Sequence, residues 1–257
     1  MINTINFKID SLNGMKTYPK DIYFIGNTNL LKSKKISIVG TRKPISYTKV
    51  LTHEISSKLS NANITVVSGV AMGVDAIAHN ASINNTIAVV ANGLNIRYPA
   101  VNKNLIQQIE KNSLILSTYK ENEKARAYTF VQRNELVVAL GDILIITQAD
   151  LNSGSLRSAQ FALDMGKKIY VLPHRIGESQ GTNELLEKGL ATAIYDVDKF
   201  IAQITGNKKE IINTDKFLEY CKQNPNYDLA VKKYNQKVFE YELLGKISIQ
   251  NGNITVC

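Results

Sequence analysis

A chain of 257 residues, 44% of them hydrophobic, can form one large domain or a medium domain with a small appendage. Its formal net charge of +9 and isoelectric point near 9.3 favour a phosphate-rich partner, although a lysine-coated surface would give the same charge. Its two cysteines lie outside any C-x-x-C pair and its three histidines are scattered, which excludes a zinc or disulfide framework.

The first segment, residues 1–14, lacks the apolar core of a signal peptide. No apolar run elsewhere in the chain approaches the length of a membrane span. We therefore expect a cytoplasmic protein that makes no membrane contact. The lack of a ligand cluster leads us to expect neither a metal nor a cofactor.

Short β-branched runs alternate with amphipathic segments such as residues 47–61, whose apolar side chains follow a helical stripe. Strands are predicted at residues 36–39, 64–68, 86–91, 114–117, 142–147, 168–172 and 193–196. These runs are apolar throughout, which is typical of a parallel sheet buried on both faces and joined by right-handed crossovers. The sequence therefore predicts an α/β fold with an open, doubly wound, mostly parallel sheet.

The composition changes after residue 205. A polar linker, "TGNKKEIINT", is followed by two or three short helical segments and by alternating residues around Asn251-Gly252, a strong hairpin signal. We predict a sheet domain over residues 1–205 and a small winged-helix-like module over residues 210–257.

Ligands of doubly wound sheets bind at the carboxyl ends of the strands, so function is sought in the loops that follow them. In "GTRKPIS", Gly40 allows a sharp turn, and a helix start behind it would favour an anion. Arg42 adds a charged fork suited to phosphate. A surface arginine beside a tight turn is the alternative, and we favour the phosphate contact because the next loop repeats the design. The missing G-x-G-x-x-G pattern argues against a dinucleotide.

The second loop, "SGVAMGVDAIAH", repeats this design. We interpret Ser68 and Gly69 as phosphate contacts, Asp75 as a helix cap and His79 as a packed, hydrogen-bonded core residue. The lysines before the first predicted strand, residues 32–35, are interpreted as a solvated face.

Four motifs occur in order: "IVGTRKPISY", "VVSGVAMGVDAIAHNASI", "TIAVVANGLNIRYPAVNKNL" and "FVQRNELVVALGDILIITQADLNSGSLRSAQFA". Together they make residues 18–192 resemble the DNA-processing protein A (DprA, also called Smf) family. The resemblance implies an extended Rossmann-like domain that binds single-stranded DNA, forms a homodimer and loads the RecA recombinase during natural transformation. Many members of the family carry a small winged-helix-like domain at the C-terminus.

The resemblance also implies a DNA-binding pocket, and charge considerations add Lys167 to it. The expected residues are Gly40, Thr41, Arg42, Ser68, Gly69, Phe130, Arg133, Asn134, Ser153, Gly154, Ser155 and Lys167. Phe130, or else Tyr128 or Tyr119, would stack on a base. Phe130 fits equally well as a core residue that anchors a helix start. For Arg133 we favour a binding role.

The sequence departs from the family pattern at several positions. Thr118 follows Ser117 where the family usually has glutamate, and Glu135 replaces the second arginine of Arg-Asn-Arg. His174 and Thr48 stand where glycines are expected. Glu135 is expected to offset part of the positive field of the pocket.

Two enzyme classes on related folds are alternatives. Nucleotide phosphoribohydrolases use a P-G-G-x-G-T-x-x-E loop, but "LNSGSLRSAQ" lacks both the double glycine and the glutamate. Without that carboxylate the chain has no general acid or nucleophile for glycosidic cleavage, so no catalytic residue is predicted. The second class is the nicotinamide-dependent oxidoreductases. The chain lacks their glycine fingerprint and the acidic residue that ends their second strand. A binding protein is therefore favoured over both.

Overall fold

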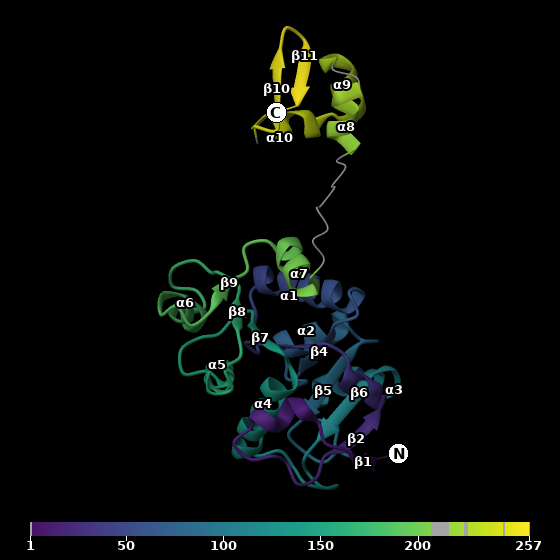
Figure 1. Ribbon diagram of the computed structural model, residues 1–257, viewed down its shortest axis with the longest axis vertical. Helices are drawn as coiled ribbons and strands as arrows, with labels where there is room; N and C mark the ends of the chain where they lie inside the picture. The colour runs from purple at the N-terminus through teal and green to yellow at the C-terminus, as the bar shows by residue number, and fades with distance from the viewer. Residues whose placement is uncertain (1, 207–215, 224–225, 244, 257) are drawn as a thin grey trace. The chain divides into compact units, whose positions relative to one another are not determined.

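The computed structural model describes residues 2–206, 216–223, 226–243 and 245–256 (Figure 1). The chain divides into two compact units, Met1–Thr205 and Gly206–Cys257, which are described separately. The first unit contains the sheet and all of the motifs described above.

The first unit is built on a nine-stranded sheet in the order β1-β2-β6-β5-β4-β3-β7-β8-β9. The parallel strands are β3 (Lys35–Val39), β4 (Thr65–Ser68), β5 (Thr86–Val90), β6 (Leu114–Ser117), β7 (Ile143–Ile146), β8 (Ile169–Val171) and β9 (Thr192–Ala193). At one edge, β2 (Tyr23–Gly26) pairs antiparallel with β6, and β1 (Asn3–Thr4) pairs antiparallel with β2. The mostly parallel, doubly wound α/β sheet is as predicted.

The parallel strands differ from the predicted ones chiefly at the ends of the sheet. The last predicted strand shrinks to Thr192–Ala193, because the Asp196 carboxylate accepts a hydrogen bond from Lys199 N at 2.9 Å and the chain turns into the next helix. Strand β2 was not predicted. Its side chains are only partly buried, so it lacks the continuous apolar run of the central strands.

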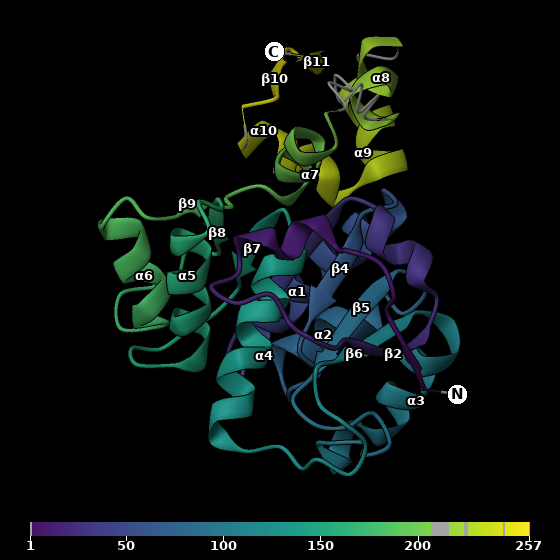
Figure 2. The same cartoon turned by 60° about the horizontal axis from the view of Figure 1, so that its bottom comes forward.

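Helices cover both faces of the sheet (Figures 1 and 2). One face packs against α1 (Ser46–Asn61), α2 (Val74–Ala81), α3 (Lys103–Asn112) and α7 (Val197–Thr205). The other packs against α4 (Ala127–Leu140), α5 (Gly154–Asp164), α6 (Gln180–Glu187) and the short helix η1 (Asp10–Gly14). Two further short helices, η2 (Thr28–Lys32) and η3 (Ala100–Asn102), lie in the connections. Burial on both faces explains the apolar strands.

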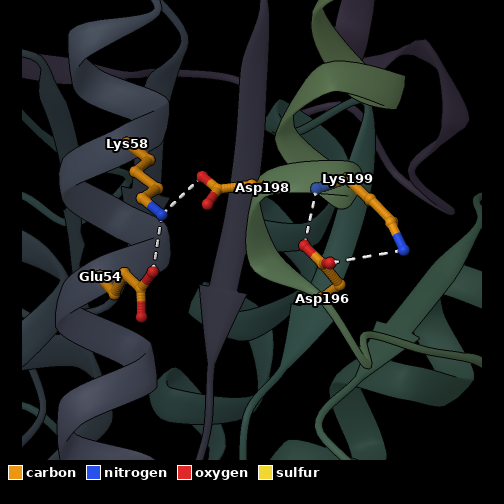
Figure 3. Close-up of polar contacts among 5 residues, drawn as sticks. All are labelled: Glu54, Lys58, Asp196, Asp198 and Lys199. Carbon is orange, nitrogen blue, oxygen red and sulfur yellow. Dashed lines mark hydrogen bonds and ion pairs between the residues drawn. The ribbon is translucent and has the colours of Figure 1, made fainter. Parts of the chain in front are cut away.

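Helix α7 is held against α1 by both apolar and polar contacts. Phe200 packs on Tyr170 with ring centroids 5.0 Å apart. Figure 3 shows Lys58 of α1 between two carboxylates, 2.6 Å from Asp198 and 2.7 Å from Glu54. The hydrogen bond to Asp198 raises the pKa of Lys58 most, and the hydrogen bond to Glu54 raises it further. The start of α7 is thus an integral part of the first unit.

The second unit contains α8 (Lys216–Gln223), α9 (Tyr227–Tyr234), α10 (Gln236–Leu243) and the hairpin of β10 (Ile247–Gln250) and β11 (Asn253–Val256). Positive φ angles of 50° at Asn251 and 73° at Gly252 match the turn that this residue pair predicts. Phe217, Val238 and Ile254 belong to a small core of its own. The helices and hairpin agree with the sequence, whereas the winged-helix assignment stays a prediction. Most of the predicted linker lies outside the described residues.

Candidate functional site

The direction of winding reverses between β3 and β7, because the chain proceeds from β3 to β4 on one side and reaches β7 on the other. Loops diverge from such a switch point and leave a crevice at the carboxyl ends of the strands. A groove with a cavity volume of about 420 Å³ lies there, and we call it the switch-point groove. Eight of the predicted residues line it: Gly40, Thr41, Arg42, Arg133, Asn134, Ser153, Gly154 and Ser155.

The loop after β3 is fixed by its backbone and by close packing. Thr41 N donates to Gln148 O at 2.9 Å, and Thr41 O accepts from Val74 N at 3.2 Å. A side chain at Gly40 would overlap Val74, so glycine here permits the close approach of α2. Helix α1 begins only at Ser46. The helix predicted over residues 47–61 is therefore confirmed, but its first turn is six residues from Gly40, and the exposed side chain of Arg42 supplies the positive charge beside the turn.

The loop after β4 serves structure more than ligand contact. Ser68 is fully buried, and its hydroxyl donates to Ile38 O at 2.6 Å. Gly69 O accepts a hydrogen bond from Arg133 Nη1, and a side chain at Gly69 would overlap that guanidinium. Gly73 has a φ of 79° that favours glycine. The Ser68 hydroxyl therefore does not reach the switch-point groove, and Gly69 contributes by making room for Arg133.

Arg133 of α4 is a buried cation with 5% of its surface exposed. Besides Gly69 O, its Nη1 donates to Val89 O at 3.1 Å, whereas its Nε has no partner among the described residues. Burial lowers the pKa of Arg133, and the nearby Asp75 carboxylate opposes that shift. A guanidinium held from behind, with donor capacity left over, is suited to receive an anion from the groove.

Asp75 is not the helix cap that the sequence predicts. Helix α2 begins at Val74, and the Asp75 carboxylate accepts from Ala71 N at 3.3 Å within the preceding loop. Burial raises the pKa of Asp75, and Arg133 opposes the rise. Further along α2, burial lowers the pKa of His79 to about 3, so its imidazole is neutral. Its Nδ1 lies 2.7 Å from Thr86 Oγ1, which agrees with the predicted structural role.

Phe130, at the start of α4, lies close to both arginines. The guanidinium carbons of Arg42 and Arg133 are 5.8 and 5.9 Å from its ring centroid, within cation–π range. The ring is half-buried and belongs to none of the hydrophobic cores, so the core interpretation of Phe130 is not supported. Tyr98 is 49% exposed, and its ring centroid lies 6.2 Å from that of Phe130. The two rings border a recess of about 40 Å³, the Phe130 recess, which shares Arg42 and Arg133 with the groove.

The far wall of the groove is the start of α5. The Ser153 hydroxyl caps this helix by accepting from Leu156 N at 3.4 Å. The N–H groups that precede Leu156 in the first turn have no intrahelical partner, because they lie at the start of the helix. Gly154 is exposed, and Asn134 of α4 lies close to it. Ser155 is buried but lines the groove. Unlike the loop after β3, this turn leads directly into a helix.

Lys167 does not join these residues, and its assignment to the pocket is wrong. It precedes β8 and therefore lies at the amino edge of the parallel sheet. Its ammonium donates to Val138 O, Ala139 O and Gly141 O at 2.6 to 2.8 Å, where α4 ends. Burial lowers the pKa of Lys167 to about 8. Lys167 therefore satisfies free carbonyl groups at the C-terminus of α4. The sequence alone did not distinguish this structural role from contact with a ligand.

Comparison with known proteins shows the family of the chain. The profile of the DNA recombination-mediator protein A family matches residues 9–205. The chain belongs to this family. It is 33% identical to DNA processing protein DprA of Streptococcus pneumoniae over 186 residues, which cover 70% of this chain and 66% of the relative. It is 31% identical to DNA processing protein DprA of Bacillus subtilis over 192 residues, which cover 72% of this chain and 64% of that relative.

Solved structures agree with this family. DNA processing protein A of Helicobacter pylori, described for its single-stranded DNA binding mode, has a TM-score of 0.79 at 40% identity and covers 80% of this chain and 96% of its own. The Streptococcus pneumoniae structure has a TM-score of 0.73 at 30% identity, covering 79% of this chain and 73% of its own. The chain spans about two thirds or less of the length of the curated relatives named above.

The family assignment confirms the resemblance found in the sequence. In the described part of the chain, no cluster of His, Cys, Asp and Glu side chains is arranged to hold a metal ion. Within the same ranges, no helix is both long and apolar enough to cross a membrane.

The departures from the family pattern lie mostly outside the groove. Glu135 Oε1 accepts from Lys16 N at 3.0 Å, so this carboxylate anchors the N-terminal segment. His174 Nε2 contacts Thr147 O at 2.8 Å beside the end of β7. Thr48 is buried within α1. None of these side chains lines the switch-point groove.

The residues on either side of Thr118, the remaining departure, have structural roles. Ser117 is buried, and its hydroxyl donates to Asn92 O at 2.7 Å. The adjacent Tyr119 is buried too, and its hydroxyl donates to Gln132 Oε1 at 2.9 Å. Tyr119 is therefore not free to stack on a base, whereas Tyr128 is 55% exposed.

Several groove and recess residues were not predicted, among them the polar or large side chains of Lys43, Met72, Tyr98 and Asp150. All four lie in loops that follow parallel strands, and that position is the signal that could have found them. Asp150 brings a negative charge to a groove whose remaining charged side chains are Arg42, Lys43, Arg133 and the buried Asp75.

Proposed function

We propose that this chain binds single-stranded DNA in the switch-point groove, with phosphates near Arg42 and Arg133 and a base beside Phe130. The observation that carries the proposal is an aromatic ring within cation–π distance of two guanidinium groups at the carboxyl edge of the sheet. Cations supply sequence-independent affinity for phosphates, and a ring supplies stacking that any base can use. The single-stranded DNA binding described for the Helicobacter pylori relative supports the same ligand.

A single strand fits this arrangement better than a duplex. The rings of Phe130 and Tyr98 border a recess rather than a flat surface, so a base must leave its stack to reach them. In a duplex the bases are paired and stacked, and extruding one costs about a few kcal/mol. We therefore expect weaker binding of double-stranded DNA.

We further propose that binding protects the strand and helps to load the RecA recombinase during natural transformation, in the cytoplasm and as a homodimer. The family assignment supports this role. The excess of 31 basic over 22 acidic residues favours association with a polyanion.

The deciding experiment compares Arg42→Ala with wild type in fluorescence anisotropy titrations of oligo-dT at several salt concentrations. We expect about a tenfold or greater loss of affinity at low salt, and a log–log salt slope smaller by about 0.7 because one phosphate contact is lost. Lys111→Ala is the matched control, since it removes the same charge from an exposed position near the end of α3. Unchanged affinity of Arg42→Ala would contradict the proposal.

A parallel assay incubates the wild-type protein with free nucleotides and follows release of base or phosphate. We expect no turnover, because no carboxylate stands at the position that a phosphoribohydrolase requires. Turnover that Arg42→Ala abolishes would instead make the groove an active site.

A further inference from the structure

A second hollow lies beside the switch-point groove, where the loop after β8 meets the start of α1. It has a cavity volume of about 570 Å³, and its walls include Ile45, Tyr47, His174, Arg175 and Glu178. We call it the Tyr47 hollow. None of these residues belongs to the site described above.

The two rings of the hollow are held in place by the backbone. The Tyr47 hydroxyl donates to Pro173 O at 3.2 Å, and the His174 ring lies edge-on to Tyr47 with centroids 5.4 Å apart and planes at 85°. His174 Nε2 lies 2.8 Å from Thr147 O, and a carbonyl only accepts, so this nitrogen carries the proton. Two anchored rings form a surface that needs little ordering when a flat ligand binds.

The hollow and the switch-point groove share one loop. Residues 40–43 line the groove, and residues 45–47 line the hollow. Gln148 fixes both parts, since its backbone oxygen accepts from Thr41 N at 2.9 Å and its Oε1 accepts from Ile45 N at 3.1 Å. Lys43 and Ile45 are two residues apart, so their Cα atoms are at most about 7 Å from each other. A strand that leaves the groove along this loop meets the hollow next.

The composition of the hollow fits a base better than a phosphate. Tyr47 is 43% exposed and Ile45 37% exposed, so an aromatic and an aliphatic surface are both open to a ligand. One cation, Arg175, and one carboxylate, Glu178, line the walls and leave no net charge to attract an anion. A nucleobase offers a π-face for Tyr47 and polar edges for the charged side chains.

We propose that the Tyr47 hollow is a second nucleobase subsite, which receives a base of the same strand whose phosphates lie in the switch-point groove. This inference rests on the proposed function. The subsite depends on His174, whose ring occupies a position at which the sequence pattern leads us to expect glycine. It is therefore a feature of this chain's own residues.

The test uses full-length Tyr47→Ala and a series of oligo-dT lengths, starting from the shortest that binds wild type. Loss of one stacking contact should weaken binding of the longer oligonucleotides by about five- to a hundredfold and leave the shortest unaffected. Arg42→Ala should weaken binding at every length. Tyr47→Phe keeps the ring and should stay within about twofold of wild type, and Tyr195→Ala provides a control, because this tyrosine is 84% exposed and lines neither cavity.

His174→Gly is the second variant, and it should give the same length-dependent loss if Tyr47→Ala fails to fold, as judged by circular dichroism. Photo-crosslinking of oligonucleotides carrying 5-iodouracil should label the peptides that contain Tyr47 or His174. If both variants bind every length like wild type while Arg42→Ala is impaired, the subsite is refuted and the proposed function stands. If instead Tyr47→Ala changes only the oligomeric state, the hollow is a protein interface and the subsite is likewise refuted.

Discussion

The two edges of the parallel sheet both bury basic side chains, but they leave them in different states. At the amino edge, the Lys35 ammonium donates to Leu31 O at 2.9 Å and to Ser33 O at 2.8 Å, and Lys167 donates to three carbonyls. At the carboxyl edge, Arg133 keeps an Nε without a partner among the described residues, and Arg42 is exposed. The lysines are satisfied within the fold, whereas the arginines retain capacity for a ligand.

This difference follows from strand direction rather than from residue type. Helices of a parallel sheet end at the amino edge, where their last carbonyls attract cations. At the carboxyl edge the loops diverge at the switch point, so a cation there faces a crevice. The contrast teaches that a buried basic residue should be assigned a role only after its edge is known. Four substitutions test the contrast.

The largest effect is expected for Arg133→Met, which removes the guanidinium next to the buried Asp75 carboxylate. Leaving one partner of a buried charge pair costs about 3–5 kcal/mol of the free energy of unfolding. The raised pKa of Asp75 should rise further, since Arg133 is the charge that opposes the rise. A carboxyl with a raised folded-state pKa stabilises the fold when protonated, so the deficit should shrink as pH falls toward the ordinary value of 3.8.

Urea unfolding of Arg133→Met at several pH values measures this effect. The double variant Arg133→Met with Asp75→Asn is the matched control, and it should lose less stability than the sum of the two single variants. Additive losses, or a deficit that is independent of pH, would show that the two groups are not coupled.

The next effect concerns binding. Phe130→Ala removes the ring that lies close to Arg42 and Arg133, and we expect a loss of about 1–3 kcal/mol in the free energy of oligo-dT binding. Because the ring belongs to no core cluster, thermal stability should change much less than affinity. Phe130→Tyr keeps the ring and serves as the control in the same titrations. A large drop in the melting temperature with unchanged affinity would return Phe130 to a purely structural role.

At the amino edge the pattern should be reversed. Lys167→Met keeps the aliphatic stem but removes three hydrogen bonds, so we expect a loss of about 1–2 kcal/mol in stability at pH 7 and unchanged DNA affinity. The pKa of Lys167 is lowered from 10.5 to about 8, so the unfolded state binds more protons between these values. Wild-type stability should therefore rise relative to the variant as pH increases through this window.

Chemical denaturation of both proteins across this window, together with one oligo-dT titration at neutral pH, checks the Lys167 prediction. Lys168→Met changes the neighbouring exposed lysine and is the control. A loss of DNA affinity in Lys167→Met alone would place this lysine back in the binding site.

The sequence was sufficient for the sheet and for the family, because long apolar strands and loop motifs are local signals. The sequence also predicted several groove residues, namely Arg42, Arg133 and those at the start of α5. These residues follow parallel strands or face the ends of the strands. The sequence could not predict that the Ser68 hydroxyl points to Ile38 O or that Lys167 ends a helix. These contacts join residues 30 and 29 positions apart, and their partners are backbone atoms that leave no pattern in the sequence.

The smallest effect is expected for Glu135→Gln. The sequence suggested that Glu135 offsets the positive field of the pocket, but its carboxylate accepts a hydrogen bond from Lys16 N and lines neither the groove nor the Phe130 recess. Dissolved salt screens the repulsion between such a carboxylate and a bound strand, so its effect on binding is largest at low ionic strength. Removing this charge should therefore raise oligo-dT affinity by less than about threefold, and only at low salt, which anisotropy titrations can resolve. Asp150→Asn is the informative control, because Asp150 does line the groove and its neutralisation should raise affinity more. If Glu135→Gln had the larger effect, the field of the whole carboxyl edge, rather than the side chains that line the groove, would control binding.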